Sequence, residues 1–241
     1  MHGVHEIAGS SPASPTMNAY RLKILACVLM TIDHIGVVFF PTMALFRIIG
    51  RPVFLIFAYL LTEGIKHSKN HKKYLATIFL FALITEPVYK WLLHNQSHNI
   101  FFTLFAGMCS VLIYEKVKNK DVALLLVILI SAVAQLLSLE YGFYGVLTIF
   151  IFSRFHLKSE YKKLFGFLLF NTAMLFTLTY LKFPTTFDRI SIWYYIQFYS
   201  LVALPILLNY DGKRGPSHKY AFYIFYPLHL AILGIIKYYI I

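Results

Sequence analysis

The sequence contains nine apolar runs, and each is close to the length of a helix that crosses a lipid bilayer. Such a helix needs about 20 residues to span a hydrocarbon core of about 30 Å. The runs are Leu22–Phe40, Ala44–Ile65, Tyr74–Leu93, Ile100–Tyr114, Val122–Leu139, Gly142–Phe155, Leu164–Leu181, Ser191–Leu208 and Tyr220–Ile240. We therefore predict an all-α fold, a polytopic transmembrane helical bundle of about nine helices.

The balance of apolar and charged residues supports a membrane protein. Hydrophobic residues make up 59% of the 241 positions and charged residues 13%, with a mean hydropathy of +0.68. A soluble domain carries about 25% charged residues. The net charge of +12 would suit nucleic acid, but the basic residues form short clusters between apolar runs rather than one exposed face. We expect a lipid bilayer around the chain and no nucleic acid partner.

The distribution of Lys and Arg predicts the topology. With the N-terminus inside, the cytoplasmic segments hold sixteen of the 22 basic residues: Arg21, Lys23, Lys66, Lys69, Lys72, Lys73, Lys116, Lys118, Lys120, Arg154, Lys158, Lys162, Lys163, Lys213, Arg214 and Lys219. The outer ends and loops hold only Lys90, Lys182, Arg189 and Lys237. Cytoplasmic loops of membrane proteins carry the excess of Lys and Arg. The predicted orientation is N-in and C-out.

The domain organisation is simple. Residues 1–16 are expected to be a disordered leader, because Ser10–Pro15 is rich in Ser and Pro, and Met17 is an alternative start. Residues 17–241 are expected to form a single transmembrane domain with very short outer loops. Cys27 and Cys109 both lie in apolar runs, so neither a disulfide nor a metal site is expected. The function must therefore lie among the helices or at their ends.

Ionisable residues cluster inside the first two apolar runs. Asp33, His34, Arg47, Arg51 and Glu63 all lie between positions 30 and 64. A charge within a membrane span is costly and marks a functional site by default. These residues are our first candidates for the chemistry.

Depth along the helices brings two of these side chains, together with Glu86 of the third run, to one level. With a rise of about 1.5 Å per residue, His34 and Glu86 lie about 18 Å above the cytoplasmic face and Arg51 about 20 Å. Asp33 and His34 are adjacent, so their side chains diverge by about 100° on a helix. We therefore expect Glu86 to orient His34, and Asp33 to face Arg47 or Arg51. The alternatives are a structural Asp33–Arg51 ion pair and a structural histidine.

Eight short motifs resemble one family along the whole chain after residue 17. They are Thr31–Gly36, Arg47–Phe54, Glu63-Gly64, Thr85–Pro87, Asn99–Thr103, Glu140–Gly145, Asn209–Gly215 and Phe222–Leu230. In that order they resemble the TraX family, which is named for an enzyme that N-acetylates the amino terminus of F-type conjugative pilin. The family is similar to the lysosomal heparan glucosaminide N-acetyltransferase and to acyltransferase family three.

The resemblance implies a multi-pass acetyltransferase of the bacterial cytoplasmic (inner) membrane, with cytoplasmic acetyl-CoA as the acyl donor. The acceptor would be an amine or hydroxyl of a pilin-like peptide or of a cell-surface glycan. Acyl transfer needs a general base and a donor to the oxyanion. His34 is the expected base, with Asp33, Glu86 and Arg51 completing the catalytic set; Arg51, Thr103 and Tyr226 are candidate oxyanion donors.

Two further sets of residues are assigned to the substrates. Cations suit the phosphates of the donor, and the expected donor-binding residues are Arg47, Arg51, Lys66, Lys73, Lys213, Arg214, Tyr226 and His229. The expected acceptor-binding residues are Asn99, Thr103 and Glu140. No metal is expected. A transporter or channel with a polar pathway is the alternative function, although no internal repeat typical of a secondary transporter is visible; an assembly subunit is a third.

Overall fold

The computed structural model describes residues 17–94, 96–182 and 195–239, and every regular element within these ranges is a helix. The predicted all-α fold is confirmed for this part of the chain. The elements are α1 (Ala19–Phe39), α2 (Ala44–Gly50), α3 (Pro52–His67), α4 (His71–Leu93), α5 (Ile100–Lys116), α6 (Lys120–Leu136), α7 (Gly142–Arg154), α8 (Tyr161–Lys182), the 3-10 helix η2 (Ile196–Val202), α10 (Ala203–Leu208) and α11 (Lys219–Tyr239). The predicted leader 1–16 lies outside the described residues.

Four helices begin after an asparagine whose side chain accepts a backbone N–H of the first turn. These caps are Asn18 for α1, Asn70 for α4, Asn99 for α5 and Asn119 for α6. An asparagine cap satisfies one of the N–H groups that a helix start leaves without a partner. The sequence thus marks these boundaries with a polar residue just before the helix.

The second predicted run, Ala44–Ile65, is two helices in the structure, which is a correction to the sequence prediction. Helix α2 ends at Gly50 and α3 begins at Pro52. Proline has no backbone N–H and suits the first position of a helix. The eighth run is likewise divided into η2 and α10, and its first residues, 191–194, lie outside the described part.

Several of these helices have the length and composition of membrane spans. Within the described residues, four stretches qualify: α1, the α2–α3 pair (Ala44–His67), α4, and Tyr220–Tyr239 of α11. Gly142–Arg154 and Ile196–Leu208 are apolar but shorter. The chain is thus a multi-pass membrane protein, while the total of about nine spans and the N-in orientation stay predictions.

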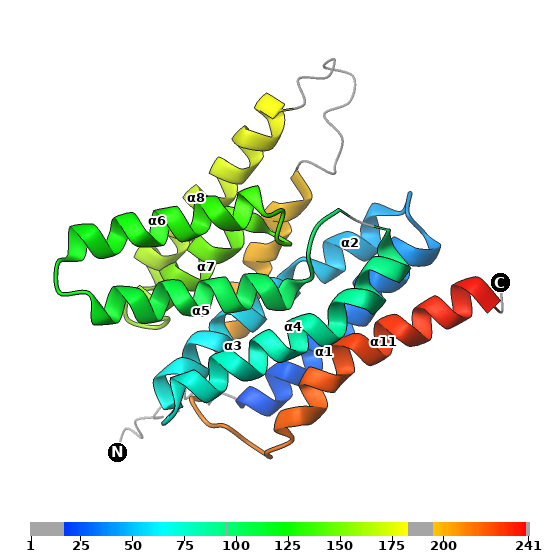
Figure 1. The fold of residues 1–241 in the computed structure, drawn as a ribbon, viewed down its shortest axis with the longest axis horizontal. Coiled ribbons are helices and arrows are strands. Elements are labelled where there is room, and N and C mark those ends of the chain that lie inside the picture. Colours follow the sequence, from blue (N-terminus) through cyan, green and yellow to red (C-terminus); the bar gives the residue numbers. More distant parts are fainter. Residues whose placement is uncertain (1–16, 95, 183–194, 240–241) are drawn as a thin grey trace, which may run out of the picture.

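Helix α3 lies at the centre of the bundle. It packs against α1 on one side and against α5 and α7 on the other, and ten of its residues are buried. Helices α1, α4 and α11 lie together on one side of the molecule, and α5 to α8 lie together on the other (Figure 1). The polar residues of α1 and α3 are therefore enclosed by helices from distant parts of the sequence.

The loops gather at two opposite ends. At one end, the Ala19 N–H donates to the Lys213 carbonyl over 2.9 Å, and Tyr210 packs edge-on against Tyr59 of α3 with ring centroids 5.8 Å apart. At the other end, the His98 N–H donates to the Ser138 carbonyl over 2.9 Å. The first end thus holds part of the predicted basic set, Lys213 among it, whereas the connection 137–141 at the second end contains no Lys or Arg.

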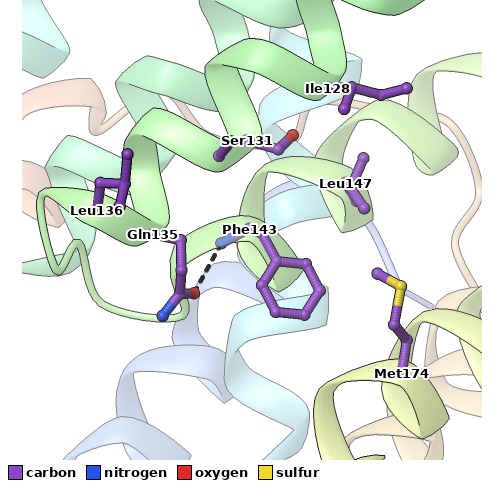
Figure 2. Close-up of a pocket in the computed structure, with 8 residues that line it drawn as sticks. Ile128, Ser131, Gln135, Leu136, Phe143, Leu147 and Met174 are labelled. Atoms are coloured by element: carbon purple, nitrogen blue, oxygen red, sulfur yellow. Dashed lines mark hydrogen bonds between the residues drawn. The ribbon is translucent and has the colours of Figure 1, made fainter. Parts of the chain in front are cut away.

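One face of the bundle is apolar and open. Helix α6 exposes Leu124, Leu125, Ile128, Leu129, Val133 and Leu136. A shallow cavity of about 400 Å³ lies between α6, α7 and α8. Figure 2 shows it lined by Ile128, Leu147 and Met174, with the Phe143 N–H donating to Gln135 Oε1 over 3.3 Å at its edge. Among the described residues no ionisable side chain lines this cavity, so it suits lipid chains rather than chemistry.

Candidate functional site

An ion network lies between α1 and the α2–α3 junction. Arg47 Nη1 donates to Asp33 Oδ2 over 2.5 Å, and Arg51 Nη2 donates to Asp33 Oδ1 over 3.4 Å. Arg51 Nη1 also donates to Gln197 Oε1 of η2 over 3.2 Å. We call Asp33, Arg47, Arg51 and Gln197 the arginine cluster. The predicted pairing of Asp33 with Arg47 or Arg51 is confirmed, and Asp33 pairs with both.

The motif around Arg51 explains how the cluster forms. The Arg51 N–H is shared by the carbonyls of Arg47 (3.1 Å) and Ile48 (3.3 Å), because Pro52 has no N–H to offer. Arg51 Nε donates to the Arg47 carbonyl as well, over 3.3 Å. A methyl group at Gly50 would overlap the Asp33 side chain, so only glycine allows α2 to approach α1 this closely.

A chain of hydrogen bonds continues from the arginine cluster into α7. Gln197 Nε2 donates to the Tyr144 hydroxyl over 3.2 Å, and that hydroxyl lies 3.3 Å from Ser200 Oγ. The sequence analysis missed Gln197, Tyr144 and Ser200. A single amide within an apolar run is the signal that would have found Gln197, since a buried polar group needs a partner.

Glu86 belongs to a second polar group at the loop end of α4 and α5. Its carboxylate accepts the backbone N–H of Asn99 over 3.1 Å and Asn99 Nδ2 over 2.7 Å. His98 Nδ1 lies 2.7 Å from the other carboxylate oxygen. The predicted pairing of Glu86 with His34 is therefore wrong. The cause is the cap of α5, since Asn99 also donates to the Ala82 carbonyl over 2.8 Å and so holds the start of α5 against α4.

The remaining predicted acceptor residues lie beside this group. The Thr103 hydroxyl donates to the Glu140 backbone carbonyl, so its proton is not free for an oxyanion. Asn99 uses both of its side-chain polar atoms, because Oδ1 accepts the Phe101 N–H over 3.0 Å. Both residues are fully buried, and in this arrangement they support the N-terminal ends of α5 and α7.

Glu140 lies in the connection 137–141, outside the predicted spans. Its Oε2 is buried and has no hydrogen-bond partner in the described part of the chain. Burial raises the pKa of the Glu140 carboxyl to about 7, against the opposing effect of Arg47. Ser138 and Tyr141, on either side, have φ values of 53° and 64°. Such values are costly for residues with side chains.

A pair of histidines joins α1 to α11. His34 Nδ1 lies 3.1 Å from His229 Nε2, and both residues are buried, at 7% and 6% exposure. His34 Nδ1 also lies 3.0 Å from the Met30 carbonyl. The Tyr226 ring stands edge-on to His34 at 6.0 Å. We call His34 and His229 the histidine pair.

The contact with Met30 identifies the nitrogen of His34 that is available for chemistry. A carbonyl oxygen can only accept, so the nitrogen facing it, Nδ1, carries the proton. The neutral ring then has its lone pair on Nε2. Among the described residues no group hydrogen-bonds to Nε2. The catalytic role predicted for His34 stays a prediction, and the geometry gives it an open base.

The predicted donor-binding residues fall into two groups. Lys66, Lys73, Lys213 and Arg214 are exposed at the end of the bundle where α1 begins, and Lys66 Nζ pairs with Glu63 Oε1 over 2.9 Å. Arg47 and Arg51 belong to the arginine cluster, and Tyr226 and His229 surround His34. The structure therefore does not bring these eight residues into one site.

Comparison with known proteins relates the whole helical region to one family. The family described as TraX protein matches residues 19–237. A probable fimbrial assembly protein FimC, serogroup H1, of Dichelobacter nodosus is 25% identical over 241 aligned positions, which cover 90% of this chain and 94% of that protein. An uncharacterized protein of Rickettsia prowazekii (strain Madrid E) is 35% identical over 95 positions, 37% of this chain and 35% of the relative. No solved structure matches.

Proposed function

The chain belongs to the TraX family, and on that premise we propose that it is a membrane-embedded acetyltransferase. It would move an acetyl group from cytoplasmic acetyl-CoA to an amine or hydroxyl of a peptide or cell-surface acceptor. The observation that carries the proposal is the open Nε2 of His34, a neutral base buried among helices and held by the Met30 carbonyl and His229. A general base with a free lone pair is what acyl transfer to such an acceptor needs.

The chemical step uses His34 as a proton carrier. The acceptor nitrogen or oxygen attacks the thioester carbonyl, and its proton passes to His34 Nε2. As the new bond to the acetyl carbon is completed, the carbon–sulfur bond breaks and its electron pair leaves on the sulfur. His34 then gives the proton to the departing sulfur, so the products are the acetylated acceptor and CoA as the thiol.

Two other groups support this step. The oxyanion that forms on the acetyl group needs a hydrogen-bond donor, and the Tyr226 hydroxyl, on the ring beside His34, is the best placed of the predicted candidates. The donor's phosphates need cations in contact with water, and Lys213 and Arg214 are basic and exposed. We therefore propose that donor phosphates bind at this end and that the thioester reaches inward to His34.

The relatives favour a peptide amine as the acceptor. The Dichelobacter nodosus protein, which aligns over nearly its full length, is described as a probable fimbrial assembly protein. We propose that this chain modifies a pilin-like polypeptide and that it lies in the bacterial cytoplasmic (inner) membrane. The exposed apolar face of α6, which suits contact with lipid chains, fits a membrane location.

Purified protein in lipid nanodiscs would test the proposal. It is incubated with labelled acetyl-CoA and three acceptors: a peptide with a free N-terminal amine, the same peptide with a blocked N-terminus, and glucosamine. We expect label on the free peptide and none on the blocked peptide. Label on glucosamine alone would indicate that the acceptor is a glycan rather than a peptide.

The competing function makes a different prediction. A transporter or channel would carry ions or a small solute across liposomes without acetyl-CoA. Solute flux that does not depend on acetyl-CoA, together with no label on any acceptor, would overturn the proposed acetyltransferase.

A further inference from the structure

We propose that His229 is a positioning residue for the base: its Nε2 accepts a hydrogen bond from the Nδ1–H of His34 and thereby directs the lone pair of His34 toward the reacting groups. The sequence analysis placed His229 among the donor-binding residues. This inference rests on the proposed function for its kinetic consequence, whereas its structural part stands on the contacts of the two rings.

The first step is the protonation of His229 itself. Its Nδ1 lies 2.9 Å from the Phe225 carbonyl one turn earlier in α11. Because a carbonyl oxygen only accepts, the proton of neutral His229 must lie on Nδ1. The lone pair of His229 is therefore on Nε2, the atom that faces His34.

The second step is the protonation of His34. Its Nδ1 faces two acceptors, the Met30 carbonyl at 3.0 Å and His229 Nε2 at 3.1 Å. In the other tautomer of His34 the proton is on Nε2. The Nδ1 lone pair would then face the lone pairs of both acceptors, which is unfavourable. The arrangement therefore selects the Nδ1–H form, and the base of His34 is Nε2.

The third step concerns what holds the rings in place. Phe225 stacks on His229 with centroids 4.9 Å apart and an angle of 12°, and Tyr226 packs against both rings. A side-chain acceptor beside Nδ1 usually fixes both the tautomer and the orientation of a functional histidine. In many enzymes this acceptor is a carboxylate. Here it is a neutral imidazole.

The arrangement also suits the cation that His34 forms during transfer. When Nε2 takes the acceptor proton, Nδ1–H still points at His229 Nε2, and the bond becomes charge-assisted and stronger. The Nδ1 proton stays on His34 throughout, so His229 neither gains nor loses a proton. Asp33 on the same helix is engaged by Arg47 and Arg51, which leaves His229 as the side-chain acceptor for the His34 ring.

The experiment compares two substitutions at one position. His229→Gln keeps an acceptor oxygen near the position of Nε2, whereas His229→Leu removes the acceptor with little change in volume. His94→Leu is the matched control, because His94 lies at the far end of α4 against Tyr238. We expect kcat to fall about 10–100-fold in His229→Leu, the range seen when the outer partner of a metal-bound histidine is removed, and to recover in His229→Gln. KM for acetyl-CoA should stay unchanged.

Nitrogen NMR of histidine-labelled protein gives a second readout that needs no activity. The His34 signals are assigned by their loss in His34→Ala. In wild type we expect Nδ1 to carry the proton and Nε2 to carry none; in His229→Leu a population with the proton on Nε2 should appear. A wild-type ring protonated on Nε2 would overturn the proposal even if neither His229 variant folded.

The kinetic outcomes separate the remaining possibilities. Wild-type kcat in His229→Leu would overturn the proposal, and so would equal losses in His229→Leu and His229→Gln, because that pattern indicates shape rather than hydrogen bonding. If purified wild type transfers no acetyl group but shows the expected ring protonation, the proposed function fails while the assignment of His229 as the partner of His34 is supported.

Discussion

Two neighbouring residues of α1, Asp33 and His34, belong to two polar groups that differ in charge. Asp33 belongs to the arginine cluster, where opposite charges contact each other directly across α1, α2 and α3. His34 belongs to the histidine pair, where neutral rings are satisfied by backbone carbonyls and by each other. The arginine cluster engages both oxygens of its one carboxylate with guanidinium groups, whereas the histidine pair leaves one nitrogen open.

The difference follows from what each group costs to bury. An isolated ion in an apolar interior must be paired, and a broken pair leaves an uncompensated charge. A neutral imidazole costs less and can keep a free lone pair. The contacts indicate that the arginine cluster holds the helices together, and the comparison supports the proposal that proton transfer takes place at the histidine pair.

The largest effect is expected for His34→Ala. If His34 is the general base, acetyl transfer should fall by roughly 10²–10⁴-fold, while binding of acetyl-CoA and thermal stability persist. Transfer assays quenched at fixed times measure the activity, and a melting curve with and without acetyl-CoA on the same preparation measures stability and binding. A stable His34→Ala protein with near-normal transfer would remove the histidine pair from the chemistry.

Asp33→Asn should act mainly on the fold. The substitution leaves Arg47 and Arg51 side by side without their anion, and breaking a buried pair costs about 3 kcal/mol or more. Glu115→Gln is the control, because Glu115 forms an exposed pair with Arg154 at 3.5 Å and such pairs contribute about 1 kcal/mol or less. Equal melting temperatures for the two variants would contradict a structural role for the arginine cluster.

A smaller effect is expected at the basic end. Replacing Lys213 and Arg214 with alanine should raise KM for acetyl-CoA by about three- to tenfold, as two exposed charge contacts would, with little change for the acceptor. Lys116→Ala combined with Lys118→Ala removes the same charge from another exposed loop and should leave KM unchanged. An unchanged KM in the first double variant would exclude Lys213 and Arg214 from the donor site.

The smallest effect concerns Glu140, which resembles neither group because its Oε2 has no described partner. A carboxyl whose pKa is raised to about 7 in the folded protein binds its proton more tightly there than in the unfolded chain. Its contribution to stability is complete below the unfolded pKa and is lost as pH rises through 7. Glu140→Gln should therefore melt above wild type at pH 8 but not at pH 5. Parallel curves for the two proteins would contradict this reading.

The sequence predicts the Asp33 pairing but not the surroundings of His34, and the reason is geometric. A charge in an apolar run needs an opposite charge, and Arg47 and Arg51 are the basic residues within the next apolar run. Depth alone placed Glu86 beside His34, but depth gives the height of a side chain and not the direction in which its helix turns it. The capping role of Asn99 decided that direction.

Other features have weak signals in the sequence or none. Pro52 signals the break between α2 and α3, but the length of the apolar run concealed it. Gln197 is polar within an apolar segment and was overlooked. The left-handed backbone at Ser138 and Tyr141 has no signal, because neither residue is glycine; the connection 137–141 in which they lie is hydrogen-bonded to His98.

The separation of partners along the chain bears on how the protein is made. Asp33 meets Arg47 and Arg51 only 14 and 18 residues later, so this network can close as soon as the first helical hairpin leaves the ribosome. His229 follows His34 by 195 residues and enters with α11, the last helix. Since chains emerge from the N-terminus, early ion pairing lowers the cost of inserting the charged hairpin, whereas His34 gains its partner only when synthesis is complete. A nascent or truncated chain would thus be integrated into the lipid before it is competent to react.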